Sequence, residues 1–141
     1  MSQEHYPVLW IGQVAVVTLP AEIDVTNAES VREDLLAVLN HGAVLLIADL
    51  SNTTFCDSAG VSALVRTFTQ ATASGSSSMR AVVSTPAVQR VLSITGVDRL
   101  LAIYPSVAAS LAGPHDQHVQ GDQSPAEGAT ARADTDGGGA A

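Results

Sequence analysis

Residues 45–60 read LLIADLSNTTFCDSAG, and this stretch decides the fold. It opens with an aliphatic run of the kind found in strands that are covered on at least one face of a sheet. A short polar segment follows and leads to the motif Asp57–Gly60. Behind this motif, apolar residues recur with the spacing of one helix face, at Val61, Leu64, Val65 and Phe68. The stretch therefore predicts a buried strand, a loop and a helix that begins near Ser58.

The segments on either side alternate between strand-like and helix-like patterns. Beside the central strand at 43–50, we expect strands at 8–11, 14–19, 79–83 and 100–103. Helices are expected from about 28 to 39, from 58 onward, from 86 to 95, and from about 106 to 111. Thr26 followed by Glu29 is a capping-box pattern that marks the start of the first helix. This order predicts a small, single-domain α/β fold, with a mostly parallel or mixed sheet of four to five strands and about four helices.

Composition separates a folded part from a tail. Hydrophobic residues make up 46% of the chain but aromatic residues only 4%, so the core must be aliphatic. We assign residues 1–112 to the domain. The remaining segment, 113–141, is acidic and rich in Gly and Ala, and its composition predicts disorder because it cannot bury enough apolar surface to offset its ordering entropy.

Charge and targeting signals narrow the classes of partner. The formal net charge is -8, which argues against binding to nucleic acid or to an anionic membrane surface. No apolar run approaches the ~18 residues of a membrane-spanning helix, and the N-terminus lacks a signal-peptide pattern. The single cysteine cannot form an internal disulfide, which fits a reducing compartment. We therefore expect a cytoplasmic protein.

The sequence offers little for metal, cofactor or enzyme chemistry. Its four histidines, at 5, 41, 115 and 118, form no ligand set, so no metal is expected. No glycine-rich phosphate loop is present, which argues against a nucleotide cofactor. The segment Cys56–Gly60 is one residue short of the nucleophile motif G-x-S-x-G, but the only histidines that follow it lie in the tail. We expect Cys56 to be a small buried apolar side chain; the alternative is a thiol with a lowered pKa at a helix N-terminus.

Three blocks of the sequence carry a family resemblance. They are LPAEID at 19–24, IADLSNTTFCDSAGVSA at 47–63 and VLSITGVDRLLAIYPSVAASL at 91–111. In content, order and spacing they resemble the STAS domain of bacterial anti-sigma factor antagonists, and together they cover about residues 8–112. The chain departs from the family pattern at three positions. Ala21 stands where the family has Gly, Ala59 where it has Ser or Thr, and Ser62 where it has Gly.

The resemblance implies a switch in partner binding. The unmodified protein would bind an anti-sigma factor that is also a serine kinase, and this binding would free a sigma factor. The kinase would then phosphorylate Ser58, which matches the family's acceptor serine, and a serine phosphatase would reset the switch. The resemblance implies neither an enzyme activity nor a cofactor for the protein itself.

This interpretation assigns roles to particular side chains. Asp57 would orient Ser58, and Asp24 with Glu22 would form part of the rim that faces the kinase. Phosphorylation adds about -1.5 to -2 charges at neutral pH. An acidic partner surface would then be repelled, and an apolar one would have to desolvate the phosphoryl group, so binding would weaken. The full set of predicted partner-binding residues is Glu22, Asp24, Asp57, Ser58, Ala59, Gly60 and Ser62.

Several alternatives stay open at this point. Asp57-Ser58 could be only a helix N-cap, Asp24 could merely end a strand, and Ser62 is either a second acceptor or a solvent-facing serine. Gly60 is better explained by close backbone approach than by ligand contact. The alternative function is a non-switching STAS subunit of a lipid-transport or stress-sensing complex. The sequence is compatible with a monomer or a weak dimer, and it does not name the sigma factor, the kinase or the upstream signal.

Overall fold

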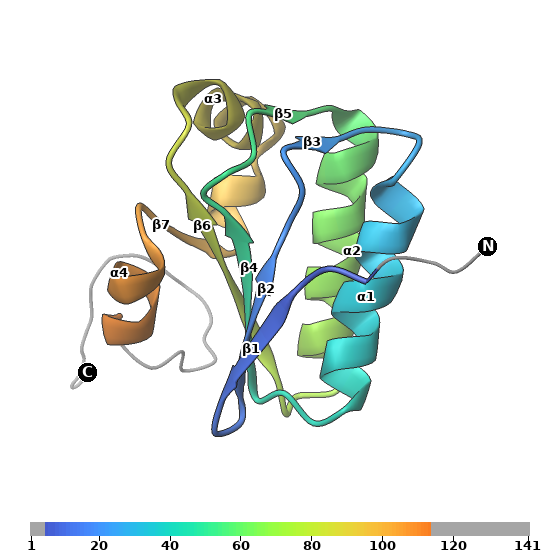
Figure 1. The fold of residues 1–141 in the computed structure, drawn as a ribbon, viewed down its shortest axis with the longest axis vertical. Coiled ribbons are helices and arrows are strands. Elements are labelled where there is room, and N and C mark those ends of the chain that lie inside the picture. The colour runs from blue at the N-terminus through green and yellow to red at the C-terminus, as the bar shows by residue number, and fades with distance from the viewer. Residues whose placement is uncertain (1–4, 114–141) are drawn as a thin grey trace.

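The computed structural model describes residues 5–113, and its main element is a five-stranded sheet (Figure 1). Neighbouring strands follow the order β1-β2-β4-β6-β7. Only the pair β1–β2 is antiparallel, and the other three pairings are parallel. The strands are β1 (Val8–Ile11), β2 (Val14–Thr18), β4 (Leu45–Leu50), β6 (Ser78–Val83) and β7 (Ala102–Tyr104). The predicted α/β fold with a mixed sheet is confirmed.

Two further strands form a small separate sheet that the sequence did not predict. β3 (Glu22–Ile23) pairs in parallel with β5 (Phe55–Cys56). Each strand has two residues, which is too short for the alternation of apolar and polar residues that reveals a strand in a sequence. This pair lies at the end of the molecule where α1 and α2 begin (Figure 1).

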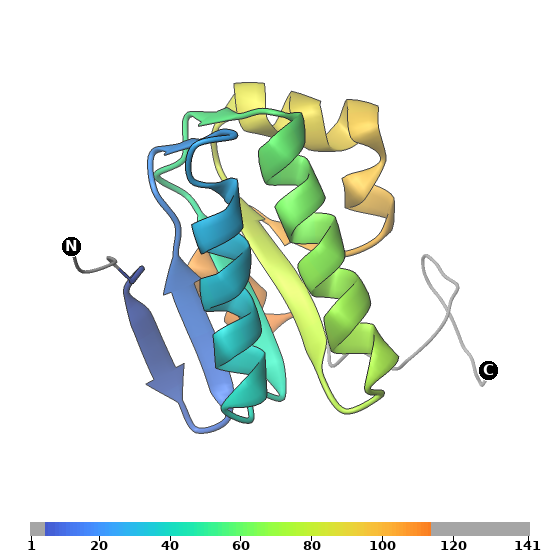
Figure 2. The same ribbon diagram turned by 90° about the vertical axis from the view of Figure 1, so that its right-hand side faces the viewer.

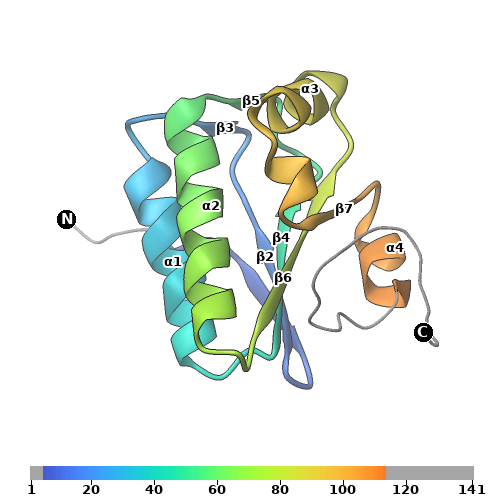
Figure 3. The same cartoon turned by 180° about the vertical axis from the view of Figure 1, so that it is seen from behind.

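Helices cover both faces of the main sheet. α1 (Ala28–Asn40) and α2 (Ser58–Ala73) lie side by side on one face (Figure 2). α4 (Val107–Ala112) lies on the other face, and α3 (Pro86–Thr95) lies at the same end as β3 and β5 (Figure 3). A short 3-10 helix, η1 (Val97–Arg99), follows α3. Within residues 5–113, no helix is both long and apolar enough to cross a membrane.

The core is aliphatic, as the composition predicts. The main cluster lies between the sheet and the α1–α2 layer, and a smaller one lies on the opposite face of the sheet. In α2, the predicted inward face is confirmed: Val61 and Leu64 are buried, and Val65 and Phe68 pack against the core. The largest fully buried side chains include Leu19, Ile23, Leu35, Leu46, Ile47, Leu50, Leu64 and Leu92.

One helix cap and one strand boundary differ from the sequence-based expectation. The first helix, α1, begins at Ala28 as expected, but the capping box is wrong, because Thr26 bonds to Asp24 and Glu29 pairs with Arg32. The last strand also begins later than expected, because η1 intervenes and extended backbone resumes only at Ala102. The predicted tail lies outside the described residues from position 114 onward.

A buried arginine of the sheet bonds to α4. Arg80 of β6 is 3% exposed, and its guanidinium donates a hydrogen bond to the carbonyl oxygen of Ser110. Its guanidinium carbon also lies 5.6 Å from the ring centroid of Tyr104, in a cation–π arrangement. The cation therefore joins the C-terminal helix to β6 and β7.

Candidate functional site

The paired strands β3 and β5 bring two loop aspartates together. Glu22 pairs with Phe55 and Ile23 with Cys56, so the next residues along the two segments, Asp24 and Asp57, are neighbours. The backbone N–H of Asp57 donates to the carbonyl oxygen of Ile23 at 3.1 Å, which fixes this juxtaposition. The beginnings of α1 and α2 thus meet at one end of the molecule.

Asp57 is the N-cap of α2. Its backbone is extended, and its Oδ1 accepts hydrogen bonds from the N–H groups of Ala59 at 2.9 Å and Gly60 at 3.2 Å. These are donors that the first turn of a helix leaves without an intrahelical partner. Asp57 therefore holds the backbone of the turn that carries Ser58.

Ser58 is the first residue of α2, and its side chain faces solvent. Within residues 5–113 its hydroxyl has no hydrogen-bond partner, and Asp57 bonds to the backbone instead of to this hydroxyl. Asp57 thus orients Ser58 through the helix cap and not through a hydrogen bond to its hydroxyl. Ser62 lies one turn further and is also exposed, whereas Ala59 between them is half-buried.

Asp24 is bound in a different way. Its Oδ1 accepts hydrogen bonds from the hydroxyl of Thr26 at 2.5 Å and from the backbone N–H of Thr26 at 2.9 Å. The hydroxyl bond and then the backbone bond lower the pKa of Asp24 from its ordinary value. Asp24 is consequently a fixed negative charge next to the start of α2.

Asn27 braces this loop, although the sequence did not single it out. Its amide nitrogen donates to the carbonyl oxygen of Glu22 at 2.8 Å, and its amide oxygen accepts from the N–H of Asp24 at 3.0 Å. An asparagine directly before an apolar helix face suggests a cap, but here its side chain bonds to the loop and not to the helix. The amide therefore sets the position of Asp24.

Gly60 and Cys56 form the inner side of the site. A Cβ atom on Gly60 would lie 2.6 Å from Sγ of Cys56 and 2.8 Å from Cγ2 of Ile23, so only glycine allows α2 to approach β3 and β5 this closely. Cys56 is 3% exposed, which confirms the small buried side chain. Burial, and next the charge of Asp57, raise the pKa of the Cys56 thiol to about 11. The alternative of a thiol with a lowered pKa is wrong, and Gly60, which is buried, acts in packing.

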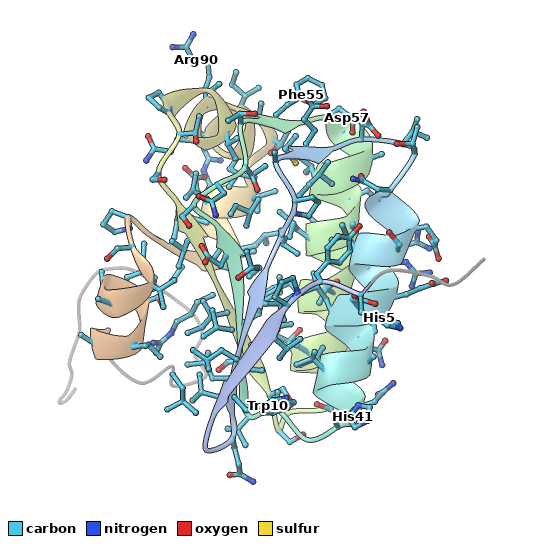
Figure 4. All side chains as sticks on the ribbon, viewed as in Figure 1. His5, Trp10, His41, Phe55, Asp57 and Arg90 are labelled. Atoms are coloured by element: carbon cyan, nitrogen blue, oxygen red, sulfur yellow. The ribbon has the colours of Figure 1, made fainter. Side chains whose placement is uncertain are left out.

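Two apolar side chains are exposed beside these charges. Val25 follows Asp24 and is 77% exposed, and Phe55 of β5 is 50% exposed. Phe55 and Asp57 project from the same end of the molecule (Figure 4). Glu22, which pairs with Phe55, is exposed as well. The surface around Ser58 therefore combines carboxylates with exposed apolar groups.

The described part of the chain offers no metal cluster at this end. No group of three or more His, Cys, Asp or Glu side chains within residues 5–113 could hold a metal ion. A cleft of about 660 Å³ lies elsewhere, between β1 and α1, lined by residues that include His5, Trp10 and His41. These three side chains lie away from Phe55 and Asp57 (Figure 4).

Solved structures of similar fold include bacterial regulators. An anti-sigma factor antagonist from Mycobacterium paratuberculosis is 27% identical, with a TM-score of 0.71 over 76% of this chain and 90% of that chain. The anti-sigma factor antagonist SpoIIAA, a Bacillus cell fate determinant, is 16% identical in its unphosphorylated form, with a TM-score of 0.63 over 79% and 99% of the two chains. It has been solved in the phosphorylated form too.

An anion transporter contains a domain of the same fold. The murine anion transporter Solute Carrier 26 family member A9 is 23% identical, with a TM-score of 0.60 over 72% of this chain but only 18% of the transporter. At this identity the likeness shows the fold alone, as it does for SpoIIAA. Comparison with curated proteins gives no match. The model of the STAS domain family matches residues 7–110, and the chain therefore belongs to the STAS domain family.

Proposed function

We propose that this protein is an anti-sigma factor antagonist regulated at Ser58. The unphosphorylated form binds an anti-sigma factor that has serine-kinase activity, and a sigma factor is released. Phosphorylation of Ser58 ends the binding, a serine phosphatase restores it, and the protein itself is not an enzyme. The observation that carries the proposal is the exposed Ser58 hydroxyl, without a partner in residues 5–113, on a first turn capped by Asp57. The similarity to the mycobacterial antagonist supports it.

The position of Ser58 suits a phosphate acceptor. Its hydroxyl is exposed and no hydrogen bond within residues 5–113 has to break before it reacts. The turn beneath it is held by the Asp57 cap and by the packing of Gly60, so a kinase meets a fixed target. Ser58 can therefore be modified without disturbing the core.

The charges around Ser58 explain why modification weakens binding. A helix N-terminus often accepts an anion, but the carboxylate of Asp57 already occupies the N–H groups of Ala59 and Gly60. A phosphoryl group on Ser58 would therefore remain at the surface, beside Asp57 and near Asp24. A partner that covers the apolar Val25 and Phe55 would have to desolvate that dianion and approach the neighbouring carboxylates.

Affinity capture from a lysate of the native host tests the switch. The baits are the wild type, Ser58→Ala, Ser58→Asp and Ser76→Asp, with ADP present. Ser76 is an exposed serine just beyond the far end of α2, so the last variant controls for added charge alone. We expect all baits except Ser58→Asp to capture an anti-sigma factor with a kinase domain, and that kinase to phosphorylate wild type but not Ser58→Ala.

Calorimetry with the captured partner then measures how much the substitution at Ser58 weakens binding. Ser58→Asp is expected to weaken binding by at least ~1 kcal/mol, which is about fivefold, with an unchanged circular dichroism spectrum. Equal affinities of the wild type and Ser58→Asp would contradict the charge mechanism. Phosphorylation of Ser58→Ala to the wild-type level would contradict the assignment of the acceptor.

A second function has one observation in its favour. The same fold forms part of a murine anion transporter. On this alternative, the present chain would be a non-switching STAS subunit of a transport or stress-sensing complex. In that case, Ser58 would serve only as the first residue of a capped helix. Wild type and Ser58→Asp would then capture the same transport or sensory proteins.

A further inference from the structure

The outer strand β1 differs from the rest of the sheet. In the part of the chain that the structure describes, β1 pairs with β2 and with no strand on its other side. All four of its residues are large, apolar and exposed: Val8 by 38%, Leu9 by 59%, Trp10 by 42% and Ile11 by 46%. Val8 and Trp10 line the cleft beside α1, so Leu9 and Ile11 project from the opposite face of the sheet. Both faces of the strand are therefore apolar.

The hydrogen bonding of β1 leaves a defined set of backbone groups on the outer edge. In an antiparallel pair, the N–H and C=O of a residue point towards one neighbouring strand, and those of the next residue point away from it. The carbonyl oxygen of Pro7 accepts from the N–H of Thr18 at 2.9 Å, so Pro7, Leu9 and Ile11 point towards β2. Val8 and Trp10 consequently direct their N–H and C=O groups outwards.

This edge lacks the charges that usually protect an outer strand. Natural sheets commonly place charged side chains, proline or a bulge on exposed edges to prevent pairing with another chain. Here residues 5–21 contain no Asp, Glu, Lys or Arg, in a chain of net charge -8. At this net charge two copies repel each other overall, and the residues of β1 add no charge to that repulsion.

We propose that two copies of this chain associate through antiparallel pairing of their β1 strands. In a two-fold arrangement the faces of the two sheets continue into each other, and hydrogen bonds join the residues that point outwards. Val8 of each copy then pairs with Trp10 of the other, and the two Leu9 side chains meet on the two-fold axis. This register uses every outward-facing group of β1, leaves Pro7 at a position that needs no N–H, and makes the two sheets continuous.

The dimer leaves the proposed switch accessible. Trp10 and Asp57 project from opposite ends of the molecule (Figure 4), so pairing at β1 does not cover Ser58. Each dimer would present two Ser58 sites to a partner. The proposal does not depend on what the Ser58 site binds.

Sedimentation equilibrium of the full chain tests the association. Wild type is compared with Leu9→Lys, which places two introduced lysines opposite each other on the axis, and with Ile94→Lys as control. Ile94 is 77% exposed on α3, so its replacement removes an exposed apolar side chain at another site. We expect a monomer–dimer equilibrium in wild type and in Ile94→Lys, and a dissociation constant weakened by about tenfold or more in Leu9→Lys. A monomer at all concentrations up to the solubility limit overturns the proposal, as does an unchanged equilibrium in Leu9→Lys.

Cysteine cross-linking tests the register. In the proposed pairing, the Leu9 Cα atoms approach to about 4.5 Å, which lies within disulfide range. Two Ile11 positions would be four residues apart along the strands, about 13 Å. We expect Leu9→Cys to form a covalent dimer under mild oxidation and Ile11→Cys to remain a monomer; the reverse result overturns the register. Cys56 is buried and does not compete.

The single tryptophan reports on the same contact. Trp10 is the only tryptophan in the chain, and its emission should shift to shorter wavelength as the protein concentration rises through the dimer range. Hydrogen exchange supplies a second reading, because the outward-facing N–H groups of Val8 and Trp10 should become protected over the same range. Protection of these amides in a monomeric sample would show that another segment of the chain covers β1, and would overturn the proposal.

Discussion

Asp24 and Asp57 occupy matching positions, each directly after one of two paired two-residue strands, yet their carboxylates have different partners. Asp57 accepts from two N–H groups of the helix that follows it. Asp24 accepts twice from Thr26, and the helix that follows begins only at Ala28 without a side-chain cap. At Asp57 the chain passes directly from strand to helix, whereas at Asp24 a loop intervenes.

This difference explains the composition of the site. Because α2 begins immediately after β5, Ser58 is displayed on a rigid first turn. Because α1 begins later, the loop can expose Val25 and hold the charge of Asp24 beside that turn. The direct connection from β5 to α2 thus carries the proposed acceptor, and the loop between β3 and α1 forms part of the surface around it.

The largest expected effect is a loss of stability when the close packing of α2 against β3 and β5 is disturbed. Gly60→Ala would place a Cβ atom 2.6 Å from Sγ of Cys56, so the helix must move or the core must distort. We expect a loss of about 1–3 kcal/mol in the free energy of unfolding, measured with urea. Ser62→Ala, on the exposed side of the same helix, should cost little. Cys56→Ala should recover part of the loss in a double-mutant cycle, since it removes one of the contacting atoms; strictly additive effects would contradict this packing.

The next largest effect is the difference in stability lost when each of the two aspartates is replaced. Asp57→Ala leaves two N–H groups of α2 without their acceptor and should cost about 1 kcal/mol, whereas Asp57→Asn keeps an acceptor and should cost less. Asp24→Ala removes only hydrogen bonds within an exposed loop and should cost less than Asp57→Ala. Urea denaturation of the three variants at pH 7 measures the order. Equal losses at the two positions would mean that both aspartates cap their helices.

Much of this architecture could be predicted from residue patterns, and the exceptions have a physical cause. The aliphatic run before Leu50 and the spacing of Val61 and Leu64 identify β4 and α2, because burial requires that periodicity. β3 and β5 carry no such signal, since they are held by pairing between segments about 30 residues apart. The capping box of α1 was wrong because the side chains of Thr26 and Asn27 bond within the loop before the helix, and local propensity does not determine these hydrogen bonds.

The smallest expected effect concerns the charge of Asp24. Hydrogen bonds from Thr26 lower the pKa of Asp24 in the folded state, so folding favours the ionised carboxylate. The resulting stability is present above the ordinary pKa of 3.8 and is lost as the pH falls through the lower, folded-state pKa. Asp24→Asn should therefore reduce the acid sensitivity of the urea midpoint below about pH 4, while its midpoint at pH 7 is slightly lower than that of wild type. Glu22→Gln is the matched control, because this nearby carboxylate accepts no hydrogen bond from residues 5–113. An identical pH profile for Asp24→Asn and wild type would show that the Thr26 bonds do not persist in solution, and the carboxylate of Asp24 would then not be held in one position beside Ser58.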